Sequence, residues 1–221
     1  MKTPGLEAAD VIGGIAPSLR RYLYVTAGIT GASVMIIEIL GAKMLSPYMG
    51  TSHLVWTAQI AVTLVALACG YYTGGKIADR SQKLDWLYLA IASAAVYLTL
   101  SALLIRPVAF WCLDLSLAPG ALLAAGLLYF VPLALLAMTA PFLIRVLTSS
   151  LAAVGANVGR LTAISTLGSF IGTLLIGYVL IPFLPNSVTL YVTALVLFLV
   201  GAGYFLLKPK AAPGVDTPRG R

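Results

Sequence analysis

The sequence has few charges, few cysteines and a single histidine, and each shortage excludes a class of protein. Charged residues make up 10% of the 221 residues, against about 25% in a soluble domain, so the chain cannot cover a globular surface with solvated side chains. Cys69 and Cys112 lie in apolar surroundings and are too few for a disulfide scaffold or a cysteine-rich metal centre. Because His53 is the only histidine, the usual histidine-based metal sites are excluded too, and we expect neither a metal nor a cofactor.

The positive net charge does not indicate a nucleic-acid-binding protein. The chain has 14 Lys and Arg against 7 Asp and Glu, a formal net charge of +7. A nucleic-acid interface needs those charges on one face of a soluble fold, and this chain offers no such fold. Hydrophobic residues make up 60% of it and the mean hydropathy is +0.99. The lipid bilayer is therefore the expected partner.

Charge-free segments of the chain are long enough to cross a bilayer, which takes about 20 mostly apolar residues. The dipeptide Pro119-Gly120 and the turn at 182–187 divide the longer apolar runs, while Glu38 and Lys43 interrupt the first one. We predict an all-α integral membrane protein with six transmembrane helices. The predicted spans are 22–45, 54–75, 86–105, 121–144, 161–181 and 188–207.

Basic residues predict the orientation of these spans. An even number of spans places both termini on one side, together with twelve of the basic residues, and only Lys43 and Arg106 fall on the other side. Since basic loops stay in the cytoplasm, we predict a plasma (inner) membrane protein with both termini cytoplasmic. The predicted regions are a cytoplasmic segment 1–21, a transmembrane domain 22–207 and a basic tail 208–221 that is either solvated or lies on anionic lipid. A re-entrant segment at 108–116 is an alternative that leaves this orientation unchanged.

Small residues predict where the helices pack, because association in lipid depends on close approach of backbones. The fifth span has a wide face of Gly, Ser and Thr with Gly168-x-x-x-Gly172 as its tightest part, and the first two spans also carry small residues on one side. These three spans are the predicted interior, and the sixth, rich in Leu, Val and Phe, is predicted to face lipid. Pro132 and Pro141 predict kinks in the fourth span, as simple curvature or as a hinge for alternating access.

Glu38 is the acidic residue that lies well inside a predicted span. A charge there costs about 2.5 to 3.5 kcal/mol on insertion scales, so it should face the bundle and meet Gln59, a bound cation or a wet cavity. Its role is either that of a cation ligand or proton carrier, or that of a structural hydrogen-bonding group. The candidate substrate-binding residues are Glu38, Gln59 and Thr63, with Lys43 and Tyr48 near the outer face. Snorkelling and interfacial placement are the alternative for the last two.

The second cytoplasmic turn, 70–83, has the strongest local pattern: glycines at a helix end, then a short charged loop. Asp79 is expected to cap the start of the next helix, where a negative charge meets the positive end of the dipole, or to pair with Arg145 or Arg160. With Arg80, these residues form a candidate cytoplasmic latch.

This turn resembles the loop between the second and third helices of the major facilitator superfamily, in its Gly-x-x-Ala-Asp-Arg core. A wider resemblance is to the membrane module of transmembrane spermidine-synthase-like proteins, which are fused major-facilitator/spermidine-synthase proteins. The residues that carry it are Glu38, Lys43, Leu45, Pro47, Tyr48, Gly50, Ser52, 70–80, Pro141, Arg145, 158–161, 166–168, Gly172, Gly177 and 180–182.

That resemblance implies a half-facilitator-like bundle joined to a cytoplasmic aminopropyltransferase domain. The residues after 207 show no strands and no glycine-rich loop for such a domain, so we expect a non-catalytic module that anchors or regulates a separately encoded cytoplasmic synthase-like partner. An alternative is a small homo-oligomeric transporter, such as a homodimer, of a cationic or polar solute such as a polyamine, with Glu38 as internal ligand. A third is a structural bundle in a larger membrane complex.

Overall fold

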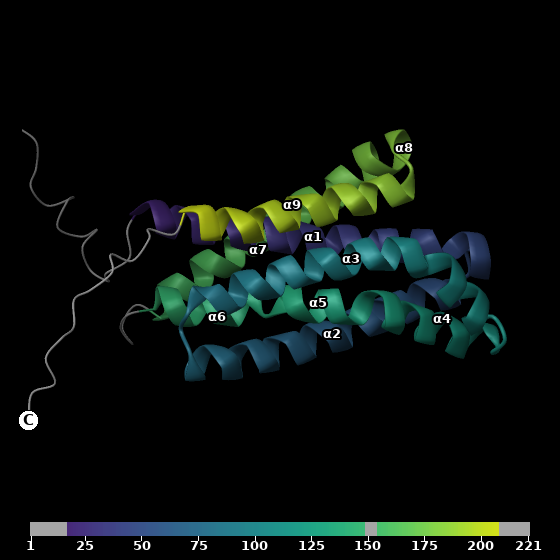
Figure 1. The fold of residues 1–221 in the computed structure, drawn as a ribbon, viewed down its shortest axis with the longest axis horizontal. Helices are drawn as coiled ribbons and strands as arrows, with labels where there is room; N and C mark the ends of the chain where they lie inside the picture. Colours follow the sequence, from purple (N-terminus) through teal and green to yellow (C-terminus); the bar gives the residue numbers. More distant parts are fainter. Residues whose placement is uncertain (1–16, 149–153, 208–221) are drawn as a thin grey trace, which may run out of the picture.

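The computed structural model describes residues 17–148 and 154–207, and over these residues every regular element is a helix (Figure 1). Six helical stretches are long and apolar enough to cross a membrane. The all-α, six-span architecture predicted from the sequence is therefore confirmed. The expectations for the segment before Pro17 and for the basic tail lie outside the described residues.

Three spans are single uninterrupted helices at the start of the chain, and the other three follow with breaks in two of them. The first three are α1 Pro17–Met49, α2 His53–Arg80 and α3 Leu84–Cys112. The fourth consists of α4 Leu117–Ala125, the π-helical segment η2 Gly126–Phe130, α5 Val131–Ala137 and α6 Thr139–Leu147. The fifth consists of α7 Val154–Leu175, the π-helical segment η4 Ile176–Leu180 and α8 Ile181–Phe183, and the sixth is α9 Asn186–Leu207.

Every span is longer than the predicted one, since helices extend into the headgroup region where charged side chains are tolerated. The predicted start of the fourth span is wrong, and the alternative given for 108–116 is not observed. The fourth span begins at Leu117 rather than near Ala121, because Pro119 lies in the first turn, where its missing N–H would have no helical partner in any case. The re-entrant segment at 108–116 is not formed, because α3 continues through Pro107 to Cys112.

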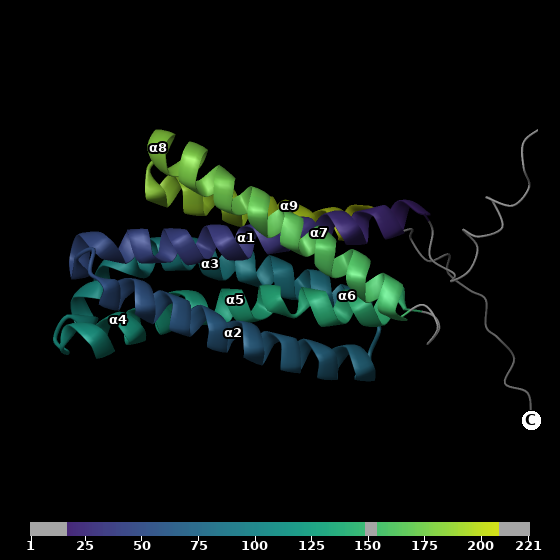
Figure 2. The same ribbon diagram turned by 180° about the vertical axis from the view of Figure 1, so that it is seen from behind.

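Helix α1 lies at the centre of the bundle. It contacts α7 and α9 on one side and α2, α3 and the fourth span on the other, as the two opposite views show (Figures 1 and 2). The most buried spans are the fourth and the first, in which 56% and 50% of the residues in an apolar 18-residue stretch are buried. The fold is thus a bundle around α1 and the broken fourth span.

The fifth span was predicted to be interior, and this is wrong, because only 11% of the residues in its apolar 18-residue stretch are buried. Its small-residue face packs on α1, while Leu167, Phe170 and Ile171 are exposed. In the sixth span 39% of the residues in the corresponding stretch are buried, the same share as in the second and third spans. The reason is that α9 packs along α3 and α1. A stripe of small residues therefore identified the packed face of the fifth span, but not the number of its neighbours.

The glycines of α7 make the close backbone contact that their spacing predicts. Gly168 lies against the backbone of Gly28, and a Cβ added at Gly172 would lie 2.6 Å from the carbonyl oxygen of Ala32. Ser169 Oγ also donates a 3.1 Å hydrogen bond to the carbonyl of Gly31. Because Gly28 meets Gly168 and Ala32 meets Gly172, α1 and α7 run parallel, as the first and fifth spans of an alternating bundle must.

Pro132 and Pro141 each lie close to an interruption of the helix inside the fourth span. Pro132 has no N–H for the carbonyls four and five residues before it, Leu128 and Leu127, and η2 forms at this point. Hydroxyls of α3 replace the missing donors: Tyr97 Oη donates to the Leu127 carbonyl at 2.6 Å and Ser101 Oγ to the Leu128 carbonyl at 2.7 Å. A second break lies at the residue between α5 and α6, three residues before Pro141. The predicted kinks are confirmed, and the hinge role stays a prediction.

Candidate functional site

A cavity of about 360 Å³ opens between α1, α2, the junction of α5 and α6, and α7. Helix α1 forms its floor through Ala27, Thr30, Gly31, Val34 and Met35, which share one helix face. The two flanks are α2, through Leu67 and Tyr71, and the first half of α7. The cavity therefore lies on the side of α1 between α2 and α7, which the other helices leave open.

The polar groups of this cavity are hydroxyls, and no charged side chain is among its lining residues. The hydroxyl-bearing residues are Thr30, Tyr71, Thr139, Thr162, Ser165, Thr166 and Ser169. Thr30 and Ser169 donate to carbonyls of α1. Thr139 Oγ1, on a side chain only 2% exposed, has no hydrogen-bond partner in the described part of the chain. Buried hydroxyls normally find partners, so this enclosed oxygen without a partner is an exception, and it is not accessible from the open cavity.

Glu38 lies on the same face of α1, three and four residues beyond Met35 and Val34, at the end of the cavity away from the basic residues. It is half-buried, and no hydrogen bond or ion pair of its carboxylate is found within 17–148 and 154–207. An unpaired intramembrane carboxylate thus continues the row of residues that form the cavity floor. The opposite end of the cavity is bordered by Ile144 and Leu161, each next in sequence to an arginine.

Gln59 and Thr63 do not join this cavity. Their side chains are 0% and 1% exposed inside the bundle, and the Gln59 amide packs against Gly41, where an added Cβ would lie 2.8 Å from it. The expected hydrogen bond between Gln59 and Glu38 is absent. The tight fit of the amide on the α1 backbone directs it toward Gly41, one turn past the glutamate. The amide and the Thr63 hydroxyl have no partners among the described residues.

Lys43 and Tyr48 lie further along α1 and are not brought together with Glu38. Lys43 is exposed, and five residues along a helix place it on another face. The Tyr48 ring packs edge-on against Phe110, with ring centroids 5.6 Å apart. The positions of both residues agree with the alternative of snorkelling and interfacial placement.

At the basic end, Asp79 pairs with Arg145 at 3.4 Å, which joins the last turn of α2 to the last turn of α6. This is one of the two partners expected for Asp79, and no ion pair of Arg160 or Arg80 occurs among the described residues. The expectation that Asp79 caps the next helix is wrong, because Asp79 lies inside α2. Asp85 takes the favourable place in the first turn of α3.

Sequence reasoning missed the hydroxyls of the cavity. They come from four different spans, and a lone Thr or Ser in a membrane helix usually bonds to its own backbone, as Thr73 does to Cys69. The signal that points to Thr139 is its place between the break at Met138 and Pro141. No group of three His, Cys, Asp or Glu side chains lies close enough to hold a metal in the part of the chain that the structure describes.

The comparisons with known proteins add no identity to this geometry. No family model, no curated protein and no solved structure matches the chain. The resemblance to spermidine-synthase-like membrane modules therefore stays a prediction from the residues quoted for it, and the functional argument rests on the six-span bundle, the cavity and Glu38.

Proposed function

We propose that this chain binds a cationic or polar solute in the cavity on α1 and carries it across the membrane. Glu38 is the charged ligand of that solute, and the hydroxyls of α7 are its neutral ligands. The observation that carries the proposal is a half-buried intramembrane carboxylate that has no partner among the residues the structure describes and lies one turn from a hydroxyl-lined cavity.

The energetics favour a cation at this place. A carboxylate near the bilayer centre is costly when alone, and a positive group beside it offsets much of that cost. Threonine and serine hydroxyls supply oxygen acceptors that replace part of the hydration shell of an ammonium group. Polyamines are the first solutes to test, because the quoted resemblance to spermidine-synthase-like modules points to them.

A second copy of the chain completes the proposed site. The cavity is open on the flank between α2 and α7, and only 11% of the residues in an 18-residue stretch of the fifth span are buried in the single chain. Transporters of the facilitator type place their site between two structural repeats, and six helices correspond to one repeat. In the homodimer, this flank faces its counterpart, so that the two cavities meet.

The other expectation from the sequence was recruitment of a cytoplasmic synthase-like enzyme. No feature of the described residues favours that role over transport, and it stays a prediction. Purification of the tagged chain from its native membrane tests it, because a soluble methyltransferase-fold protein should then be recovered in repeated preparations.

Uptake into vesicles that contain only this protein tests the transport proposal. We expect labelled spermidine or putrescine to accumulate with the wild-type protein and at least about tenfold more slowly with Glu38→Gln, since a lost charge partner of this kind is worth about 1.5 to 3 kcal/mol. Asp114→Asn is the matched control, because that acid is exposed at the far end of the bundle and should leave uptake unchanged. Equal uptake by the wild type and Glu38→Gln would refute the role of Glu38.

A further inference from the structure

An apolar groove separates α2 from α3 at the basic end of the bundle. In both views the two helices lie apart, with α5 and α6 between them (Figures 1 and 2). The groove has a volume of about 220 Å³, and its lining includes Ile77 of α2, Trp86 and Leu89 of α3, and Met138 and Phe142 on its floor. Trp86 and Leu89 are 57% and 51% exposed, so the groove is open to the surrounding hydrocarbon.

The groove continues along α3 into a shallower one of about 330 Å³ that shares Leu89 and Ser93 with it and reaches Leu100. From Trp86 to Leu100 an α-helix rises about 21 Å. One leaflet of a bilayer is about 15 Å deep, half of a hydrocarbon core of about 30 Å. The two joined grooves are therefore long enough to hold one acyl chain over the full depth of its leaflet.

Two basic residues lie near the Trp86 end of the joined grooves. Arg80 is the last residue of α2, one turn beyond Ile77, and Lys83 immediately precedes α3, one turn before Trp86. Both are exposed, and neither has an ion pair within the described ranges. The nearby acids are engaged elsewhere, since Asp79 pairs with Arg145 and Asp85 forms a side-chain hydrogen bond with Tyr204.

We propose that an anionic phospholipid binds here, with its phosphate against Arg80 and Lys83 and one acyl chain in the groove between α2 and α3. Basic pockets between transmembrane helices bind anionic headgroups, and a basic residue near the surface contributes enough to change relative affinity about fivefold. The groove shares no lining residue with the solute cavity, so this proposal does not depend on transport.

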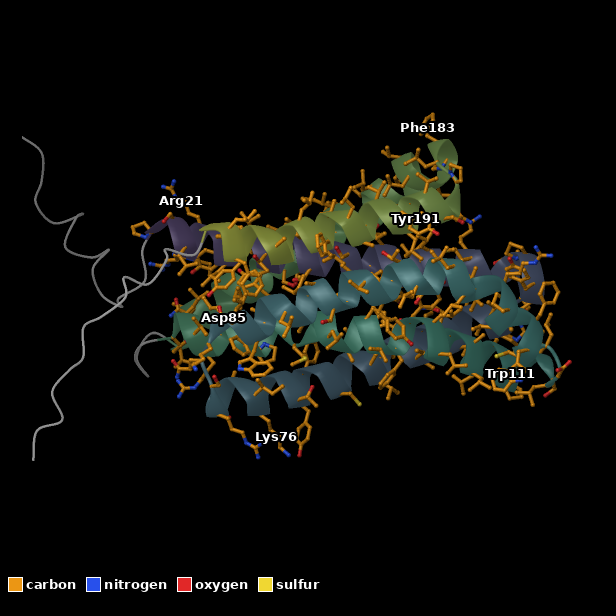
Figure 3. The ribbon with its side chains drawn as sticks, in the orientation of Figure 1. Arg21, Lys76, Asp85, Trp111, Phe183 and Tyr191 are labelled. Atoms are coloured by element: carbon orange, nitrogen blue, oxygen red, sulfur yellow. The ribbon has the colours of Figure 1, made fainter. Side chains whose placement is uncertain are left out.

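Lys76 provides a matched control on the same helix. Its ammonium group lies 4.2 Å from the centroid of the Tyr72 ring, and its side chain points away from the bundle (Figure 3). It is absent from the residues that line the groove. Lys76→Gln removes the same charge from the same end of the protein without touching the proposed site.

Quenching of Trp86 fluorescence by brominated lipid tests the proposal. Trp56→Phe and Trp111→Phe leave Trp86 as the only tryptophan, and the protein is placed in mixed vesicles of phosphatidylglycerol and phosphatidylcholine with bromine on one lipid at a time. We expect brominated phosphatidylglycerol to quench Trp86 more strongly at equal mole fraction. That preference should fall about fivefold with Arg80→Gln or Lys83→Gln and stay unchanged with Lys76→Gln.

Two results would overturn the proposal. The first is equal quenching of the protein with native Arg80 and Lys83 by the two lipids, a comparison that needs no variant at the binding site to fold. The second is an equal loss of preference in Lys76→Gln, which would mean that surface charge in general attracts the lipid.

Discussion

At the residue scale, Glu38 lies beside the cavity on α1 without a hydrogen-bond or ion-pair partner in 17–148 and 154–207, although an acid inside an apolar span is costly. The glycines of α7 lie against α1, as their spacing predicts. Gln59 shows the limit of such reasoning. Its burial was predictable, but its contact with Gly41 in place of Glu38 depends on helix rotation, which a single sequence does not specify.

The contact of Gly168 with Gly28 gives a prediction for packing. We expect Gly168→Ala to destabilise the protein by about 1 to 3 kcal/mol, because the added methyl group meets backbone that cannot rotate away. Thermal unfolding of the purified protein in detergent measures this. Gly159→Ala is the control, since its Cβ meets nothing within 4 Å and alanine is the better helix former. Equal destabilisation by both changes would contradict the α1–α7 contact.

The Asp79–Arg145 pair gives a second prediction. Because the two side chains are 74% and 48% exposed, their coupling should be below about 1 kcal/mol and should weaken in high salt. A double-mutant cycle with Asp79→Asn and Arg145→Gln, measured at low and high salt, gives the coupling energy. A coupling energy of several kcal/mol that does not change with salt would show that the pair is buried. The arrangement of α2 and α6 would then differ from the one described.

At the scale of elements, the sequence predicts the spans well and their internal breaks only in part. The spans can be predicted because a charge-free segment of sufficient length is stable in lipid as a transmembrane helix. The prolines indicate where the fourth span bends, but the π-helical segments depend on donors from a neighbouring helix. Tyr97 and Ser101 lie in another span, and nothing in their local sequence marks them as partners of Leu127 and Leu128.

This dependence of η2 on α3 is testable. We expect Ser101→Ala to lower the free energy of unfolding by about 1 to 3 kcal/mol. Pro132 has no N–H to donate to the Leu128 carbonyl, so this change leaves that carbonyl without a donor in a water-free environment. Thr99→Val is the matched control, since the Thr99 hydroxyl bonds only to the Ala95 carbonyl of its own helix. Unfolding by denaturant in detergent compares the two variants. An effect of Ser101→Ala no larger than that of Thr99→Val would count against this role of the hydroxyl.

At the scale of the whole molecule, six spans place the two ends of the bundle in different aqueous compartments. Figure 3 shows Arg21 and Asp85 at one end and Trp111, Phe183 and Tyr191 toward the other. The assignment of the first of these ends to the cytoplasm rests on the excess of basic residues and stays a prediction.

Labelling of introduced cysteines in intact cells tests that orientation. In a Cys69→Ala, Cys112→Ala background, a membrane-impermeant maleimide should label Asp114→Cys from outside and reach Arg21→Cys and Lys83→Cys only after the cells are opened. All three positions are exposed at the ends of spans. Labelling of Arg21→Cys and Lys83→Cys from outside would reverse the orientation, and labelling of only one of these two would break the six-span count.

If the transport proposal holds, water and a cationic solute reach the cavity on α1. Two single-cysteine variants in a cysteine-free background test this by comparing a cavity position of α7 with a lipid-facing one. Thr166 lines the cavity, and Ile171 is 60% exposed but lies outside it. A water-soluble thiol reagent should modify Thr166→Cys rapidly and Ile171→Cys slowly. Spermidine should protect Thr166→Cys when Glu38 is present and fail to protect it in the Glu38→Gln variant. Equal, slow modification of both cysteines, unaffected by spermidine, would contradict the account.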